Sequence, residues 1–195
     1  MRPVILLFLL GISGVGYGQS PTPTPTAAST TRYTRPDPQT RRARYVKNMF
    51  GPLAIGKSVV SAGISTARNS PREWGPHWEG FGKRFASNMG RRIISNTVQF
   101  GLDEALKLDG HYYPATGRGV GARTTNAIAS AFTERNVDGK RVVAIPRFVG
   151  TYSSNIIAKE TWYPDRYSWK NGVRSGTVSL GMNVVFNLVK EFVHK

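Results

Sequence analysis

The sequence contains no cysteine and only three histidines. The absence of cysteine excludes a disulfide framework, thiolate zinc sites, iron–sulfur clusters and a cysteine nucleophile. His77, His111 and His194 are too few for a histidine-rich metal site. The chain also lacks the G-x-S-x-G and H-E-x-x-H patterns of hydrolases and zinc proteases. We therefore expect no metal, no cofactor and no nameable catalytic residue, which favours a non-enzymatic role.

Acidic side chains are also scarce. The chain has 11 of them against 27 basic ones, which gives a formal charge of +16. Residues 48–195 hold 20 of the basic and 10 of the acidic side chains, so the excess belongs to the domain as well as to the tail. This balance is typical of nucleic-acid binding, but the export predicted below argues against nucleic acid as the partner.

An unbroken apolar run, Val4–Leu10, follows the basic residue Arg2 and precedes Gly16-Tyr17-Gly18. A basic start, an apolar run and a small-x-small site are the order of a secretory signal peptide. The run is well short of the ~20 residues that span a bilayer. The sequence therefore predicts a signal peptide over residues 1–18. The mature protein would be exported to the periplasm, the outer membrane or the medium of a bacterium.

Residues 19–47 read as a disordered linker. Ser20–Thr31 alternates proline with threonine, which favours extended polyproline conformations. Arg32–Lys47 carries six basic side chains against the single acidic residue Asp37, so it forms a basic arm that can touch anionic surfaces. The folded domain is then expected over residues 48–195.

Apolar periodicity predicts a mainly α, compact helical bundle with Gly-rich helices. The strongest signal is Glu79–Asp109, where apolar or small pairs recur every four residues. Such a stripe winds around a helix, so the helix either contacts several neighbours or bends near Gly90 or Gly101. Further helices are expected over Pro52–Ala67, Ala122–Phe132, Pro146–Ile157 and Gly176–Phe192. Asp138-Gly139 predicts one β-hairpin near 133–145.

The apolar residues of three shorter segments are assigned to the core, and small residues are assigned to close contacts between helices. The core residues are Ile55, Val59, Gly63 and Ala67, then Ala127, Ile128 and Ala131, then Val178, Met182, Val185, Val189 and Phe192. Close backbone approach is expected at Gly56, Gly63, Gly82, Ala86 and Gly90.

Basic side chains recur on the polar stripe of the longest predicted helix. Lys83 and Arg84 lie about two turns before Arg91 and Arg92, which suggests an anion-binding strip. The first hypothesis is a binding or structural protein that uses this strip on an anionic envelope surface or an envelope protein, including peripheral contact with a membrane. A second hypothesis is a subunit of a membrane-associated envelope complex.

Three proline-containing aromatic segments, 73–79, 109–114 and 162–169, interrupt the predicted helices. Aromatic rings can stack on sugars beside acidic side chains, which gives a third hypothesis: a cell-wall glycan binder or hydrolase. Its candidate residues are Trp74, Trp78, Glu79, Tyr112, Trp162 and Asp165. The alternative is that the rings plug the ends of the bundle. Convergence of the three segments would favour the glycan hypothesis.

The order of several motifs resembles a family of uncharacterised exported bacterial proteins. The motifs are PREWGPHWEGFGKRFASNMG (71–90), NTVQFGLDEAL (96–106), FTERNVDGKR (132–141), RFVGTYSSNII (147–157), TWYPDR (161–166) and GTVSLGMNVVFNLVKEF (176–192). The resemblance implies a signal peptide and a largely helical domain, and it brings no catalytic residue. Asp109-Gly110-His111-Tyr112 stands where the family has D-P-R-Y, which argues against a shared catalytic role for His111.

Overall fold

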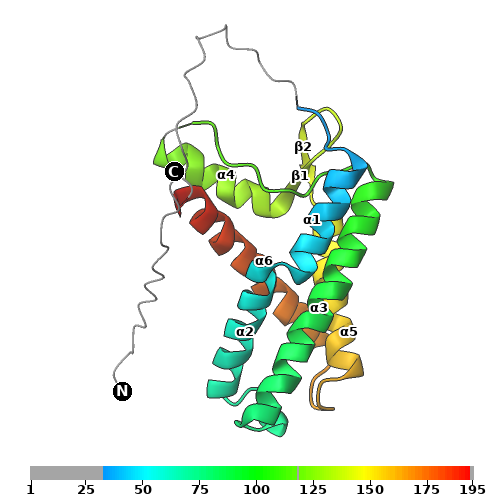
Figure 1. Cartoon of the computed structure of the whole chain (residues 1–195), viewed down its shortest axis with the longest axis vertical. Coiled ribbons are helices and arrows are strands. Elements are labelled where there is room, and N and C mark those ends of the chain that lie inside the picture. Colours follow the sequence, from blue (N-terminus) through cyan, green and yellow to red (C-terminus); the bar gives the residue numbers. More distant parts are fainter. Residues whose placement is uncertain (1–32, 118, 194–195) are drawn as a thin grey trace, which may run out of the picture. The chain divides into compact units, whose positions relative to one another are not determined.

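The computed structural model describes residues 33–117 and 119–193, which are mainly helical (Figure 1). The elements are α1 (Pro38–Phe50), α2 (Pro52–Ala67), a 3-10 turn (Arg72–Trp74), α3 (Trp78–Ala105), α4 (Val120–Phe132), β1 (Thr133–Arg135), β2 (Arg141–Val143), α5 (Ile145–Thr161) and α6 (Trp169–Val193). The predicted helical fold with one antiparallel hairpin is thus confirmed. The predicted signal peptide and the Pro/Thr-rich segment lie outside the described residues.

Prolines and turn residues set the boundaries of these elements. Pro38 and Pro52 stand at the start of α1 and α2, where a missing N–H has no helical partner to lose. Asp37 caps α1 by accepting a hydrogen bond from the backbone N–H of Thr40 at 2.9 Å. Gly139 turns the hairpin with φ at 77°, a conformation that glycine adopts without steric cost.

The structure corrects the predicted extent of the basic arm. From Pro38 onward the arm is helix α1, which packs on α3. Arg41 forms an ion pair with Glu104 of α3, with a shortest N–O distance of 2.5 Å. The ring of Tyr45 stacks on that of Phe100, with 4.6 Å between centroids. These partners lie far away in the sequence, so local composition could not reveal that the arm is folded.

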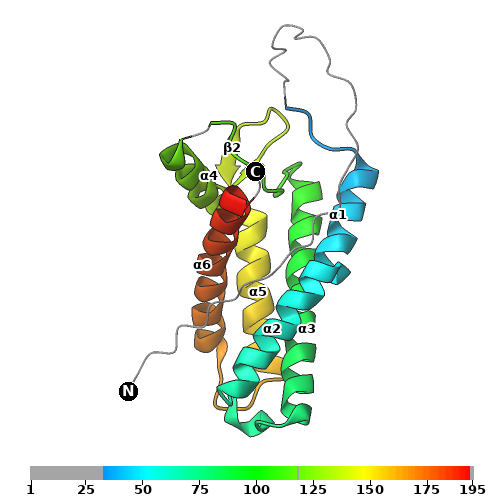
Figure 2. The ribbon, with the colours of Figure 1, turned by 60° about the vertical axis from the view of Figure 1, so that its left-hand side comes forward.

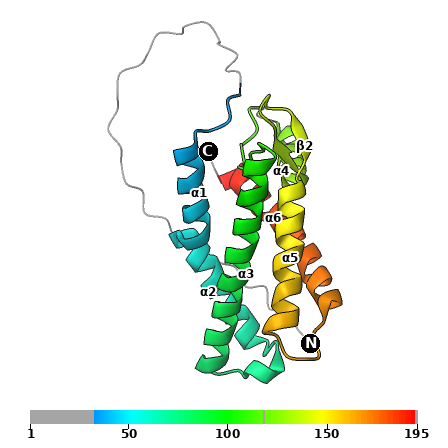
Figure 3. The same cartoon turned by 90° about the vertical axis from the view of Figure 1, so that its right-hand side faces the viewer.

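Helix α3 is the centre of the packing. It contacts α1 and α2 on one side and α5 on the other, while α5 contacts α6 and α6 contacts α4. Figure 3 shows α3 and α5 side by side, with α2 next to α3 and α6 next to α5. Lys57 of α2 reaches the ring of Phe186 of α6, with 3.8 Å from Nζ to the ring centroid. Helix α4 packs on α6 near the C-terminal end of α6, and the hairpin follows α4 (Figure 2). Helix α3 continues through Gly90 and Gly101 and contacts several neighbours, which is the first of the two predicted alternatives.

Small and polar side chains fill the space between these helices. The buried apolar residues are six alanines together with Met49, Leu108 and Leu180. Ser58, Ser87, Ser154, Asn155 and Asn187 are buried as well. Among the described residues no helix combines the length and the apolar character needed to cross a membrane.

The predicted inward faces are wrong for α2 and α6. Val178 is 61% exposed, and the other apolar residues assigned to the core of α6 are also exposed. Ile55 and Val59 of α2 face outward too, as does Ile128 of α4, although Ala127 and Ala131 are buried as expected. The reason is that periodicity locates an apolar stripe but does not tell which way it faces. Here the opposite stripe, made of alanine, serine and glycine, faces the neighbouring helices.

Glycines allow the closest helix contacts, though not at all the predicted positions. A Cβ added at Gly150 would lie 2.6 Å from the carbonyl oxygen of Ser95, and one at Gly176 would lie 2.6 Å from the ring of Tyr152. By contrast, Gly56, Gly63 and Gly82 have no such neighbour within 4 Å. Close approach therefore occurs at the α3–α5 and α5–α6 contacts and not at these three glycines.

Candidate anion-binding cavity

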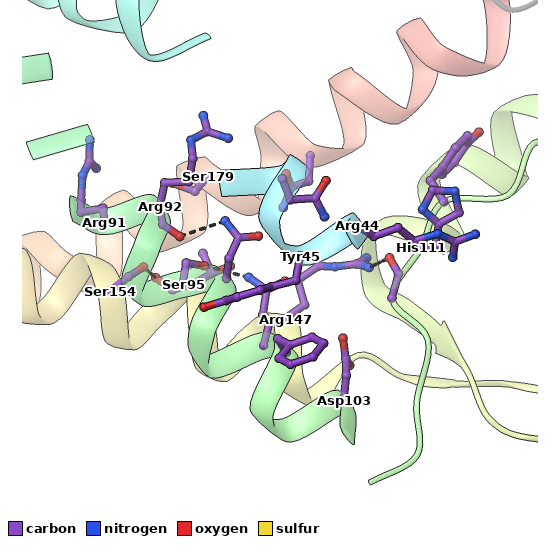
Figure 4. A pocket seen from close by; sticks show the side chains of 18 of the residues that line it. Arg44, Tyr45, Arg91, Arg92, Ser95, Asp103, His111, Arg147, Ser154 and Ser179 are labelled. Carbon is purple, nitrogen blue, oxygen red and sulfur yellow. Dashed lines mark hydrogen bonds between the residues drawn. The ribbon is translucent and has the colours of Figure 1, made fainter. Parts of the chain in front are cut away.

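A polar cavity of about 510 Å³ lies among α1, α2, α3, α5 and α6 (Figure 4). Helix α3 provides the longest part of its wall, from Asn88 to Glu104, because small residues at the helix contacts leave its polar stripe facing inward. The loop after α3, from Leu108 to Tyr112, closes one end. A cavity of this volume is in the range that accommodates small molecules.

Basic side chains outnumber acidic ones in the wall. Seven basic side chains line the cavity: Arg41, Arg44, Lys57, Arg91, Arg92, Arg147 and Lys190. The three acidic lining residues are Asp103, Glu104 and Asp109. Glu104 is paired with Arg35 and Arg41, and Asp109 lies 3.9 Å from Arg44. The acidic groups therefore neutralise some of the arginines and leave an excess of positive charge in the wall.

Four of the basic groups have no salt-bridge partner among the described residues: Lys57, Arg91, Arg92 and Lys190. Arg91 donates to the amide oxygen of Asn155 at 3.0 Å, and Arg92 reaches the hydroxyl of Ser58 at 3.5 Å. Within the part of the chain that the structure describes, the buried Nε atoms of Arg91 and Arg92 have no acceptor. A buried donor without an acceptor is costly, so an anion with spare oxygens would be favourable here.

These cations also repel one another. Burial lowers the pKa of the Lys57 amine below its ordinary value, and the charges of Lys190 and Arg92 lower it further. Burial likewise lowers the pKa of Lys190, and the nearby charge of Arg147 adds to the effect. A negative charge bound among them would relieve this repulsion, because opposite charges favour the protonated amines.

Neutral polar groups complete the wall. Hydroxyl groups come from Ser95 of α3, Ser154 of α5 and Ser179 of α6, and Figure 4 draws these side chains beside Arg91 and Arg92. Amide side chains come from Asn96 and Asn183, among others. Hydroxyl and amide groups can both donate and accept hydrogen bonds. The wall therefore suits a ligand that carries hydroxyl groups as well as negative charge.

Two carboxyl groups lie close together beneath the loop that closes the cavity. Burial raises the pKa of Asp103, and the neighbouring carboxylate of Glu134 raises it further, while burial also raises the pKa of Glu134. One oxygen of each, Oδ1 of Asp103 and Oε2 of Glu134, has no other partner within the described ranges. A proton shared between the two carboxyl groups gives both of these buried oxygens a hydrogen-bond partner. Arg147 stands 3.5 Å from Glu134 and balances the remaining charge.

This pair predicts a specific pH dependence. Because the pKa of Asp103 is raised to about 8, the folded chain keeps a proton that the unfolded chain loses near pH 4. The contribution of this proton to stability is therefore greatest at low pH and is lost as the pH rises toward 8. In Asp103→Asn this decline should be smaller, which urea unfolding at pH 5 and pH 8 can measure. Equal pH dependence of the two proteins would contradict the shared proton.

No known protein family, curated protein or solved structure matches the chain. The resemblance to exported bacterial proteins thus stays a prediction, and the role of the cavity is inferred from its geometry.

The predicted anion-binding strip is not one surface. Arg84 is 2% exposed, and its guanidinium donates to the backbone carbonyls of Ser70, Pro71 and Gly75, so it is not free to bind an anion. Lys83 is exposed, with its amine 2.6 Å from the carboxylate of Glu79 one turn away. Arg91 and Arg92 face the cavity instead. Lys83 lies on the side of α3 opposite Arg92, because nine residues at about 100° each make half a turn more than two full turns. Arg84 lies on nearly the same face as Arg91, two turns away, where the turn before α3 binds its guanidinium.

The glycan candidates fall into two places. The first and third aromatic segments meet at the end where α3 and α6 begin, since Trp74 packs on Tyr163 at 4.7 Å and Glu73 pairs with Arg166. Trp162 donates its indole N–H to the hydroxyl of Ser87 at 2.9 Å. Of the other candidates, Trp78, Glu79 and Asp165 are exposed at this end.

Tyr112 belongs to the second aromatic segment, which does not join the other two. Its hydroxyl donates to the carboxylate of Glu191, near the C-terminal end of α6. The three segments therefore do not converge on one cleft.

Sequence reasoning missed Lys57, Arg147 and Lys190 as cavity residues. The three residues come from three different helices, and only the packing of α2, α5 and α6 brings them together. One signal was present: basic residues on helices whose opposite stripe is apolar. Among the described residues no group of three or more histidine or acidic side chains is placed to hold a metal ion.

Proposed function

We propose that this protein is a non-enzymatic binding protein of the bacterial cell envelope whose cavity takes a small anion that carries hydroxyl groups, such as a sugar phosphate or a sugar acid. The observation that supports this most strongly is the set of four basic side chains without a carboxylate partner, two of which have a buried Nε without an acceptor. The envelope location is supported by the predicted signal peptide in residues 1–18.

The cavity would bind its ligand by electrostatic attraction, with the basic side chains in the cavity wall and not on an exposed strip of α3. Arg91 and Arg92 would hold the negative group from the α3 wall, with Lys57 opposite on α2. Serine and asparagine side chains would receive the hydroxyl groups. Because these groups are partly buried, salt would weaken the binding less than it weakens contacts between exposed charges.

The test is thermal unfolding with three probes at constant ionic strength: glucose 6-phosphate, inorganic phosphate and glucose. We expect glucose 6-phosphate to raise the unfolding midpoint by about 5–10 °C at a hundredfold excess over its dissociation constant. Inorganic phosphate should raise it less, and glucose should leave it unchanged. Equal stabilisation by glucose and glucose 6-phosphate would contradict an anion site.

Arg92→Gln tests the cavity most directly. Among the described residues the Arg92 side chain makes one hydrogen bond, the long one to Ser58, and removing its charge relieves the repulsion on the Lys57 amine. We therefore expect unchanged or higher stability without ligand, together with at least tenfold weaker binding of glucose 6-phosphate. Lys83→Gln, which changes a basic residue outside the cavity, is the matched control and should bind as the wild type does. Loss of binding in both variants alike would exclude the cavity as the site.

A further inference from the structure

Large apolar side chains cover the outside of the bundle. On α2, Leu53 is 68% exposed, and Val60 and Ile64 are about half exposed. On α6, Val178, Met182 and Val185 form a stripe along one face and are likewise exposed. Water around these side chains is unfavourable, because burying apolar surface is the main driving force of folding and association. An apolar surface of this extent marks a contact site.

The exposed apolar residues are spread over several helices. Helices α2 and α6 flank the α3–α5 pair (Figure 3), and Lys57 of α2 reaches the ring of Phe186 of α6, with 3.8 Å from Nζ to the ring centroid. Exposed apolar residues also occur on α5, at Val149 and Ile157. An apolar medium such as the acyl region of a bilayer can contact all three helices at once.

The helix contacts have the composition expected for such a medium. Between helices in lipid, small residues allow close approach and polar side chains hydrogen-bond across the contact. Here Gly150 meets Ser95, Gly176 meets Tyr152, and Arg91 bonds Asn155 across the α3–α5 contact. Large apolar residues face outward.

One end of the bundle carries aromatic and basic residues together. Trp78 at the start of α3 is 82% exposed, and Trp169 at the start of α6 is 55% exposed. Lys170 is exposed at the same end, and so are Lys83 and Arg166, which are paired with Glu79 and Glu73. Tryptophan and basic residues are enriched at the headgroup level of membranes, where anionic phosphates attract the cations.

We propose that the outer surface of α2, α5 and α6 contacts the acyl chains of a lipid membrane, with the end that carries Trp78 and Trp169 at the level of anionic headgroups. This contact involves a different surface from the cavity and does not depend on its ligand.

Flotation of the full chain with vesicles tests the proposal. The vesicles contain phosphatidylcholine and phosphatidylglycerol, and the buffer contains 0.5 M NaCl, which screens purely ionic attachment. We expect the wild type to float with the vesicles. Met182→Gln/Val185→Gln should float several-fold less, since it makes the α6 stripe polar. Thr125→Gln on α4, an exposed polar site, is the control and should float as the wild type does.

Two outcomes would overturn the proposal. One is a wild type that stays in the lipid-free fraction of the gradient. The other is a dimer by light scattering in buffer without lipid that Met182→Gln/Val185→Gln converts to a monomer, because this would assign the stripe to a second copy of the chain. Both variants sit at exposed positions, and circular dichroism checks that they fold. Neither outcome bears on the glucose 6-phosphate test.

Discussion

Arg84→Met is expected to lower the free energy of unfolding by about 3–5 kcal/mol, a large part of the stability of a typical domain. Arg84 Nε donates to the carbonyl of Ser70 at 2.8 Å, and its two Nη atoms donate to those of Gly75 and Pro71 at 2.6 and 2.7 Å. The guanidinium thus holds the turn between α2 and α3. Methionine fills the space but removes all three hydrogen bonds: the carbonyls of Ser70 and Gly75 lose their donor, and that of Pro71 keeps only the long bond from the Trp74 N–H at 3.4 Å. Each unpaired buried group costs about 1–3 kcal/mol.

Urea unfolding followed by circular dichroism measures this effect. Lys83→Met, at the next position but exposed, is the matched control and should leave the unfolding midpoint unchanged. Arg84→Lys keeps the charge but cannot donate in the same fork, so it should fall between the two. If Arg84→Met is as stable as Lys83→Met, then Arg84 is not the residue that holds this turn.

Glu191→Ala is expected to have a similar effect, about 3–5 kcal/mol, at the opposite end of the bundle. Glu191 is 1% exposed and accepts from the hydroxyl of Tyr112, from the backbone N–H of Ala115 at 2.8 Å and from the amide of Asn126 at 3.2 Å. Arg123 is 3.7 Å away. Alanine would leave these donors and the Arg123 charge without their acceptor, and the loop before α4 would come loose from α6.

The control for this position is Glu160→Ala, an exposed glutamate near the end of α5, which should not change stability. Unfolding in urea at pH 7 compares the two variants. A change in Glu191→Ala no larger than that in Glu160→Ala would contradict the role of Glu191 as the acceptor that holds the loop.

Glu191 also predicts how stability depends on acid. Burial raises the pKa of this carboxyl, but hydrogen bonds from Tyr112, Ala115 and Asn126 outweigh burial and hold it below its ordinary value. A lowered pKa adds stability above the ordinary range of glutamate, and that stability is lost as the pH falls. Glu191→Gln should therefore show a smaller loss of stability between pH 5 and pH 3 than the wild type does.

Local patterns predicted most helices and the hairpin. The four-residue repeat predicted α3 to within a few residues, and Asp138-Gly139 predicted the turn between β1 and β2. Helix α6 begins at Trp169, well before the predicted Gly176. Its first turns carry polar residues and glycine, so the apolar pattern did not reveal them. Boundaries of this kind depend on contacts with α5, which no local pattern records.

The direction of the helix faces could not be predicted, and the site depends on it. The apolar stripe of α6 is predicted to face the core from its helical spacing alone, yet its residues are exposed. The alanine and glycine stripe on the other side packs instead, which turns Lys190 and Asn187 toward the cavity. The same reversal places Arg91 and Arg92 inside, although the sequence predicted them on an exposed strip. The sequence thus predicted Arg91 and Arg92 as anion-binding residues, but it did not predict that they line a cavity.

Diffraction from crystals soaked in selenate tests the central claim most directly, because selenium scatters anomalously and selenate has the shape and charge of a simple tetrahedral anion. The cavity account predicts an anomalous peak within hydrogen-bond distance of the Nε atoms of Arg91 and Arg92, and no such peak in crystals of Arg92→Gln. Selenate found only at exposed lysines and arginines, with the cavity free of anomalous signal, would contradict it.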